Sequence, residues 1–326
     1  MLLRTSLLLA LTTSFALAST EETVVEQLDA TSGGSLVVDV GFGTVDIAAG
    51  AGDKVSIEAH RKIDMRDEAR ERQFLAEAPI LITKDGNTVT VRARRTDKRS
   101  WSWSGSMNMD GQYTIRVPKN FNLDLATGGG SIVAADVNGS LKASTSGGKL
   151  KLSQLKGPID ARTSGGNITL AHCEGALNVK TSGGGINATG GSGNLDARTS
   201  GGSIEVRDFK GDTVVKTSGG RLAFENIGGR VIGETSGGSI SAGLISPVPG
   251  DVQLSSSAGS IEVSVPADAA LNIEAHASSG TVSNSLPIVA TRQERDELRG
   301  SMNGGGKSMT LRASAGSVSL RPSGKM

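Results

Sequence analysis

The sequence predicts an all-β protein, a parallel β-solenoid (β-helix) of stacked 18-residue coils with an irregular N-terminal cap that contains one short helix. Three observations predict it: a Thr-Ser-Gly-Gly motif with a fixed period, a second glycine in constant phase with it, and alternating apolar residues in between. Of the 326 residues, 45 are glycine and only 3% are aromatic. Periodic glycines indicate a repeat architecture rather than disorder, and few large side chains suit a thin core.

The motif recurs every 18 residues without a slip. A Thr-Gly-Gly-Gly variant comes first and six Thr-Ser-Gly-Gly copies follow, beginning at Thr127, Thr145, Thr163, Thr181, Thr199, Thr217 and Thr235. The second glycines follow the first six threonines by twelve residues, at Gly139, Gly157, Gly175, Gly193, Gly211 and Gly229. Two glycine corners indicate two obligatory bends in each coil. We expect the first glycine of each pair, such as Gly165, Gly183 and Gly201, to adopt positive φ.

Between the corners, apolar and polar residues alternate with the period of a half-buried strand. Ile168 and Leu170 follow one glycine pair, and Leu177 and Val179 precede the next threonine. A third inward position holds Val137, Leu155, Cys173, Phe209 and Ile227. A single coil cannot bury its apolar face alone, so residue i should pair in parallel with residue i+18, roughly 4.8 Å away.

The parts before the regular repeat differ in composition. Residues 1–18 are typical of a signal peptide, with Arg4, an apolar segment and the small-residue cleavage site Ala16-Leu17-Ala18. We therefore expect export to the periplasm, outer surface or extracellular space, and no transmembrane span in the mature chain. Residues 19–126 should form an irregular β-rich cap, with a helix from Asp64, its N-cap, to Ala78 and a hairpin turn at Asp85–Asn87.

The regular solenoid should cover residues 127–244, and residues 245–326 should form degenerate coils and the C-terminal end. Pro247 and Pro249 mark a loop that breaks the count at 245–250. The segment 286–310 should be an irregular excursion, and Ser314–Leu320 the last coil. Thr31–Gly34 is an isolated early copy of the corner motif.

The sequence resembles the bacterial putative adhesin domain family, a family of β-strand repeats. The resemblance covers roughly residues 30–322 and rests on Val40–Ile47, Tyr113–Pro118, the Gly-Gly-Ser-Ile coils and Ser301–Gly306. It implies an exported or envelope-associated solenoid and supplies no catalytic residues.

Several kinds of chemistry are not expected. A net charge of +1 gives no bulk attraction for nucleic acid. Gly41-Phe42-Gly43 lacks the third glycine and the following helix of a dinucleotide loop. The three histidines have no metal-ligand spacing, so no metal, cofactor or catalytic residue is predicted. Cys173 should be buried and inert. The alternative is a polysaccharide-acting β-helix enzyme, a lyase or hydrolase, with Asp124, Asp160 and Asp196 on one outward column.

Two sets of residues are candidates for ligand binding. The residue before the threonine points outward and is a cation in four consecutive coils, at Arg162, Lys180, Arg198 and Lys216. The simpler interpretation of this column is a solvated face of mixed charge, and the sharper hypothesis is that it binds an anionic polysaccharide of the envelope. Trp101 and Trp103 could stack on a sugar or pack as a loop against the cap. We therefore expect a non-enzymatic envelope module for binding, adhesion or scaffolding, whose partner is such a polysaccharide or another envelope protein.

Overall fold

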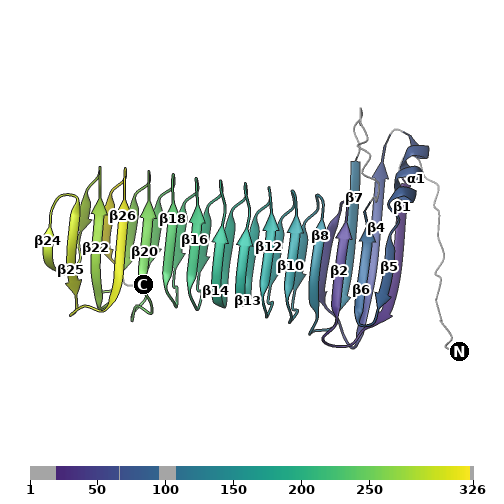
Figure 1. The fold of residues 1–326 in the computed structure, drawn as a ribbon, viewed down its shortest axis with the longest axis horizontal. Helices are drawn as coiled ribbons and strands as arrows, with labels where there is room; N and C mark the ends of the chain where they lie inside the picture. Colours follow the sequence, from purple (N-terminus) through teal and green to yellow (C-terminus); the bar gives the residue numbers. More distant parts are fainter. Residues whose placement is uncertain (1–19, 66, 95–107, 324–326) are drawn as a thin grey trace.

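The chain forms an elongated rod of stacked coils in the computed structural model, which describes residues 20–65, 67–94 and 108–323 (Figure 1). Over these residues it has 27 strands and one helix. Each coil passes through two edges, the Thr corner at its Thr-Ser-Gly-Gly motif and the Gly corner at its second glycine. The strands that lead into the Thr corner form the leading face, and those that follow it form the trailing face. The predicted signal peptide, residues 1–18, lies outside the described residues.

The leading face extends along the whole rod. From the N-terminal end its strands are β5 (Leu81–Asp85), β6 (Thr88–Ala93), β2 (Ser35–Val40), β8 (Asn122–Thr127), β10 (Leu141–Thr145), β12 (Ile159–Thr163), β13 (Ile168–Lys180), β14 (Ile186–Arg198), β16 (Thr213–Thr217), β18 (Val231–Thr235), β20 (Val252–Ser256), β26 (Lys307–Ala313), β22 (Leu271–Ala277), β25 (Glu297–Met302) and β24 (Val289–Gln293). On this face only β5 and β25 run opposite to the common strand direction.

The trailing face lies opposite. Its strands, in the same direction, are β1 (Thr20–Asp29), β4 (Lys54–Asp64), β7 (Asn108–Val117), β3 (Thr44–Ala49), β9 (Ile132–Ala135), β11 (Leu150–Ser153), β13, β14, β15 (Ile204–Arg207), β17 (Leu222–Glu225), β19 (Ile240–Gly243), β21 (Ile261–Val265), β27 (Val318–Pro322) and β23 (Val282–Asn284). Strands β13 and β14 belong to both faces because each continues through the Gly corner. Ile168 pairs with Ile186, and Ile186 with Ile204, so the predicted parallel register of 18 residues is confirmed.

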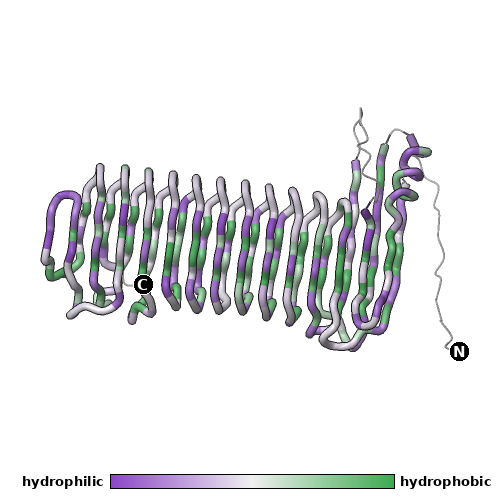
Figure 2. The backbone as a smooth tube through the Cα atoms, in the orientation of Figure 1, coloured by the Kyte–Doolittle hydropathy of each residue, from purple (hydrophilic) through white to green (hydrophobic). Residues whose placement is uncertain are grey.

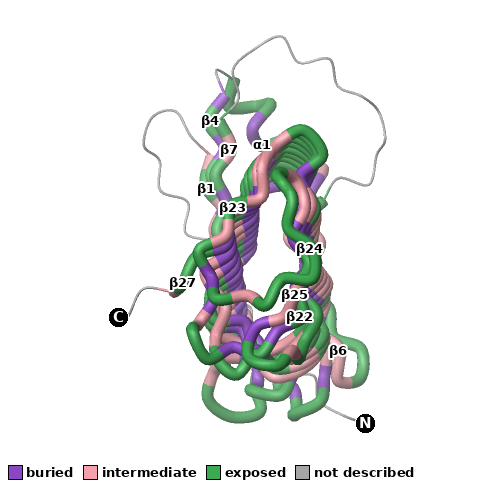
Figure 3. Tube along the Cα trace, turned by 90° about the vertical axis from the view of Figure 1, so that its left-hand side faces the viewer, coloured by how far each residue is buried: buried purple, intermediate pink, exposed green. Residues whose placement is uncertain are grey.

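The core is a continuous apolar layer between the two faces. Along each strand buried and exposed residues alternate, as in β10 and β11, because successive side chains of a strand point to opposite sides. Apolar and polar segments follow this alternation in Figure 2, and the buried positions line the inner walls in Figure 3. The third inward position is buried as expected, with Cys173 and Phe209 each 1% exposed.

The Thr corner is held by the threonine hydroxyl. In the six coils from Thr145 to Thr235, the Thr Oγ1 accepts a hydrogen bond from the backbone N–H of the second glycine three residues later, as Thr163 does from Gly166 at 3.2 Å. The same hydroxyl donates to a glycine carbonyl of the preceding coil, as Thr163 does to Gly148 at 2.9 Å. Hydrogen bonding therefore runs along the stacked Thr corners, from side chain to backbone. Each buried threonine thus ties its own turn to the coil before it.

The positive φ values occur at the Gly corner and not where we expected them. Gly157 and Gly175 have φ of 134° and 132°, whereas Gly165, Gly183 and Gly201 are absent from the positive-φ residues of the structure. The expectation for the first glycine of each pair was therefore wrong. Gly165, for example, lies inside the turn that the hydrogen bond between Thr163 and Gly166 closes. Three residues before the corner glycine, a second positive-φ position recurs in six coils, at Asp136, Gln154, His172, Gly190, Asp208 and Asn226.

At the N-terminal end, the antiparallel strands β1 and β4 extend the trailing face beyond β7. The helix α1 (Glu68–Glu77) lies beside them (Figure 1). The helix begins later than predicted, because its N-cap is Asp67 and not Asp64. The Asp67 carboxylate accepts from the backbone N–H groups of Ala69 and Arg70. The predicted hairpin turn does join β5 to β6.

Buried polar groups fasten α1 to the rod. Arg61 of β4 is 0% exposed, donates to the Ala78 carbonyl at 2.6 Å and forms an ion pair with Glu22 of β1. Glu71 of α1 accepts from the Met65 N–H and from the Thr20 hydroxyl, both at 2.7 Å. The helix therefore connects the end of β4 with the start of β1.

The early copy of the corner motif, Thr31–Gly34, lies at the Gly corner and not at a Thr corner. It directly precedes β2, whose Leu36 pairs with Leu123 and whose Val40 pairs with Thr127. Gly41-Phe42-Gly43 then occupies the Thr-corner position between β2 and β3. Its Phe42 ring packs against Phe74 of α1 at a centroid distance of 6.1 Å. The glycine motif that cannot be a dinucleotide loop is thus the first corner of the solenoid.

Each end of the rod contains a coil inserted between two others, which we call an interlaced coil. The N-terminal one, β2–β3, lies between β6–β7 and β8–β9. The C-terminal one, β26–β27, lies between β20–β21 and β22–β23. The coil containing Ser314–Leu320 is therefore last in sequence but not in space, and the hairpin β24–β25 closes that end, as Figure 1 shows.

Candidate functional site

The four predicted cations lie on adjacent strands of the leading face. In register, Arg162 is beside Lys180, Lys180 beside Arg198, and Arg198 beside Lys216. We call these four residues the cation column. Its next position is Glu234, so the run of positive charge ends there. The column follows from the 18-residue register, which places equivalent outward residues side by side.

Carboxylates pair with three of the four cations. Arg162 holds Asp160 through two hydrogen bonds of 2.8 and 2.9 Å, and Arg198 holds Asp196 in the same way. The hydrogen bond with Asp196, together with its charge, raises the pKa of Arg198. Lys216 lies 2.8 Å from Glu234. Among the described residues Lys180 has no carboxylate partner. The column therefore presents four cations against three carboxylates, with its least compensated charge at Lys180.

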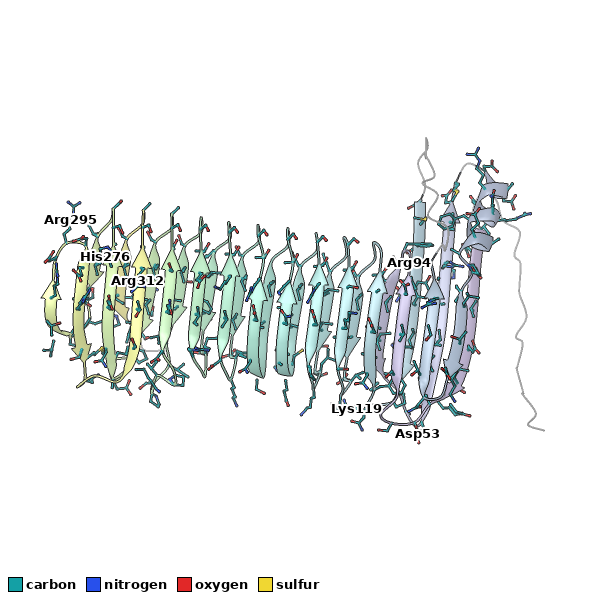
Figure 4. The ribbon with its side chains drawn as sticks, in the orientation of Figure 1. Asp53, Arg94, Lys119, His276, Arg295 and Arg312 are labelled. Atoms are coloured by element: carbon teal, nitrogen blue, oxygen red, sulfur yellow. The ribbon has the colours of Figure 1, made fainter. Side chains whose placement is uncertain are left out.

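Sequence reasoning missed further basic residues that lie in register with the cation column toward the C-terminal end of the rod. After Glu234 and Ser255 the row reaches Arg312 and then His276, because β26 is inserted between β20 and β22. Figure 4 shows Arg312, His276 and Arg295 near one another at the C-terminal end of the rod. A count of 18 residues could not find them, since the interlaced coil breaks the period.

A shallow groove of about 620 Å³ adjoins the column on the same face. It crosses β2, β8, β10, β12 and β13 beside the Gly corner. Its floor follows the residue after the corner glycine, which is small or apolar at Ser140, Pro158 and Ala176, and the equivalent residue of β8 is Asn122. From β14 onward the same position holds Asn194, Asp212 and Arg230, and the groove ends. The run of small or apolar residues at Ser140, Pro158 and Ala176 was the signal in the sequence that we did not use.

The remaining candidates are separate from one another. Trp101 and Trp103 lie outside the described residues. Cys173 is buried, and desolvation raises the pKa of its thiol, so the thiol stays protonated. In the described ranges, no three His, Cys, Asp or Glu side chains gather as a metal ion would require. None of the helical residues described there forms a segment long and apolar enough to cross a membrane.

The family model of Toastrack DUF4097 matches residues 34–321 of the chain. Among curated proteins no sequence matches. Three solved structures with some likeness are a putative cell adhesion protein of Clostridium sporogenes, a putative adhesin of Parabacteroides merdae and a putative lipid binding protein of Parabacteroides distasonis. Their identities are 11%, 10% and 11%, with TM-scores of 0.21, 0.36 and 0.30. They cover 93%, 92% and 91% of this chain, and 100%, 96% and 96% of their own. At such TM-scores these likenesses carry no argument about binding.

Proposed function

The chain belongs to the Toastrack DUF4097 family, and we propose that it is an exported, non-enzymatic binding module of the bacterial cell envelope whose leading face takes an anionic polysaccharide along the cation column. The observation that carries this proposal is the strict register of Arg162, Lys180, Arg198 and Lys216 on four adjacent strands. A rigid row of cations at roughly 4.8 Å spacing offers regularly placed contacts to a linear polymer lying along the rod.

The carboxylates paired with the cation column reduce its attraction for an anionic polysaccharide. Asp160 and Asp196 each occupy one edge of their arginine, which leaves the other guanidinium N–H groups for a ligand. Exposed charges are screened by salt, so binding should be weak per site and additive along the column. Lys180, which has no carboxylate partner among the described residues, should be the single most important cation.

The geometry of the carboxylates supports a non-enzymatic role. Asp124, Asp160 and Asp196 recur on alternate coils, roughly 9.6 Å apart by the strand spacing. Lys142 lies 3.6 Å from Asp124, and the other two carboxylates are held by arginine. Glycoside hydrolases use two carboxyl groups roughly 5–9.5 Å apart that flank the scissile bond, and this column lies at the outer limit of that range.

Retention on an immobilised anionic polysaccharide at low salt tests the proposal. Replacing all four column cations with Gln should abolish retention, because the uncompensated positive charge is lost. Asp160→Asn with Asp196→Asn should strengthen it, since two competing carboxylates disappear. The control is Lys149→Gln with Lys151→Gln, which removes two exposed cations from the trailing face. Equal retention by the wild type and the quadruple variant would refute the column as the site. Release of shortened glycan would refute the non-enzymatic role.

A further inference from the structure

The groove of the leading face has a chemistry different from that of the cation column. Its lining combines an apolar floor with a polar wall. Pro158 and Ala176 supply the floor, and Val37 of β2 continues the row of the wall. The wall is a row that reads Asp124, Lys142, Asp160 and Asn178 on successive strands. The two carboxylates outnumber the one lysine, so the groove itself does not attract an anion.

The charged groups of the wall are already neutralised by neighbours. Asp124 lies 3.6 Å from Lys142, and Asp160 is held by Arg162. Such ion pairs keep lone pairs and N–H groups free for hydrogen bonds without presenting net charge. A wall of this kind suits hydroxyl groups, which both donate and accept.

Asn178 has hydrogen-bonding capacity left over. It lies in register between Asp160 and Asp196. Its Oδ1 is buried without a partner, and none of the described residues makes a hydrogen bond with its amide. An unsatisfied polar atom beside a groove is costly and gains from a ligand. Because Asn178 lines the groove, rotation of its side chain would bring the oxygen within reach of a ligand hydroxyl, which can donate to it.

The spacing of the wall matches a sugar chain. Successive wall residues are one strand apart, roughly 4.8 Å, and carboxylates recur at every second strand. This advance is of the same order as that of one sugar in an extended, unbranched polysaccharide. The apolar floor suits the C–H faces of sugar rings, and the wall suits their hydroxyls.

We propose that this groove binds an uncharged, unbranched polysaccharide, one sugar to each coil, with the chain axis parallel to the rod. The inference rests on the proposed function in that both concern ligands lying along the leading face. It differs in ligand class: this site uses hydrogen bonds and apolar contact, whereas the cation column uses charge.

Calorimetric titration with neutral cello- and malto-oligosaccharides of increasing length tests the groove. Affinity should rise with length until the oligosaccharide spans the five strands and then level off. It should change little between low and high salt, in contrast to binding at the column. Pro158→Gln with Ala176→Gln, which fills the floor with two neutral side chains, should weaken binding roughly tenfold or more. Both residues are exposed, so the fold should be kept.

The matched control is Ala223→Gln with Ser241→Gln, two outward residues on adjacent strands of the trailing face. This variant should bind like the wild type. The proposal is overturned if no neutral oligosaccharide binds, or if the groove and control variants bind equally. Because the quadruple cation variant keeps the groove, it should still bind neutral oligosaccharides. The two proposals can therefore fail independently.

Discussion

In the Thr corner of residues 163–166, the two glycines have different surroundings. A Cβ on Gly166 would lie 1.8 Å from the carbonyl oxygen of Gly148 in the preceding coil. A Cβ on Gly165 would have its nearest neighbour at 3.8 Å, an ordinary contact. The same difference recurs at Gly183 and Gly184. The second glycine is therefore required by the close approach of backbones, and the first is replaceable.

Gly166→Ala should accordingly lower the free energy of unfolding by about 3 kcal/mol, because the coils must move apart to admit the methyl group. Gly165→Ala, one residue away in an exposed turn, should stay within about 0.5 kcal/mol of the wild type. Urea denaturation followed by circular dichroism measures both. Equal midpoints for the two variants would contradict this assignment.

Tyr113 of β7 is the only tyrosine of the chain and is 0% exposed. Within the described residues its hydroxyl makes no well-formed hydrogen bond, although nearby Arg61 favours the phenolate through its charge and its N–H groups. Burial outweighs that charge and raises the pKa of Tyr113 to about 12. Because the folded-state pKa lies above the unfolded value of about 10, the native state favours the protonated form.

The stability from this shift should be complete below pH ~10 and lost as the pH rises toward ~12. The loss should be about 2–3 kcal/mol. Tyr113→Phe should remove this alkaline loss and, by deleting an unsatisfied hydroxyl, raise stability at neutral pH by roughly 1 kcal/mol. Phenolate absorbance gives the titration directly. A folded-state midpoint near pH 10 would show that the hydroxyl is not desolvated.

The strands at the ends of the rod carry the exposed apolar side chains. Across the described ranges, the exposed large hydrophobic residues are Val25 of β1, Leu81 of β5 and Val289 of β24. Within the part of the chain that the structure describes, all three strands are unpaired along one edge. An unpaired edge with exposed apolar groups favours association with another chain, and the acidic residues of β1 oppose it.

Replacing Val25, Leu81 and Val289 with Lys should therefore reduce association at high concentration while leaving the melting temperature nearly unchanged. Analytical ultracentrifugation measures the association. The control variant places Lys at Val133, Val214 and Ile232, which point outward from the middle of the rod. If both triple variants reduce association equally, scattered surface hydrophobicity is responsible and not the strand edges.

Much of the regular solenoid could be predicted because its register is periodic. The spacing of Thr145 and Thr163 fixes which residues pair, and with it the order of Arg162 and Lys180 in the cation column. The carboxylates two residues away were also foreseeable from strand alternation. Which carboxylate forms an ion pair with a given cation, such as Glu234 with Lys216, depends on side-chain rotamers and could not be foreseen.

The interlaced coils were not predictable from local pattern. Buried and exposed residues alternate in β26 as they do in β20 and β22, so its local pattern does not indicate that it lies between them. Its position is decided by long-range pairing. Ser317, for instance, donates from its backbone N–H to the hydroxyl of Ser260, 57 residues earlier. The 18-residue period predicts the structure of a single coil. The order of the coils along the rod depends on which strands pair over long distances in sequence.

Removing residues 306–326 should therefore damage more than the last coil in sequence. Strands β22 and β23 would lose β26 and β27, which separate them from the rest of the rod. We expect β22 and β25 to lose hydrogen-exchange protection although they remain in the chain, while β10 and β12 keep theirs. Retained protection in β22 would show that this end folds on its own.

The interlaced coil also determines how the rod would respond to force. A pull on the C-terminus acts on β27, which is hydrogen-bonded to β21 on one side and β23 on the other. The strand cannot peel away from a free edge, as the last strand of a simple solenoid could. It must slide out between two neighbours, breaking both ladders while they are loaded in shear. A module tethered by this terminus would resist extraction under tension that would unravel an ordinary repeat coil by coil.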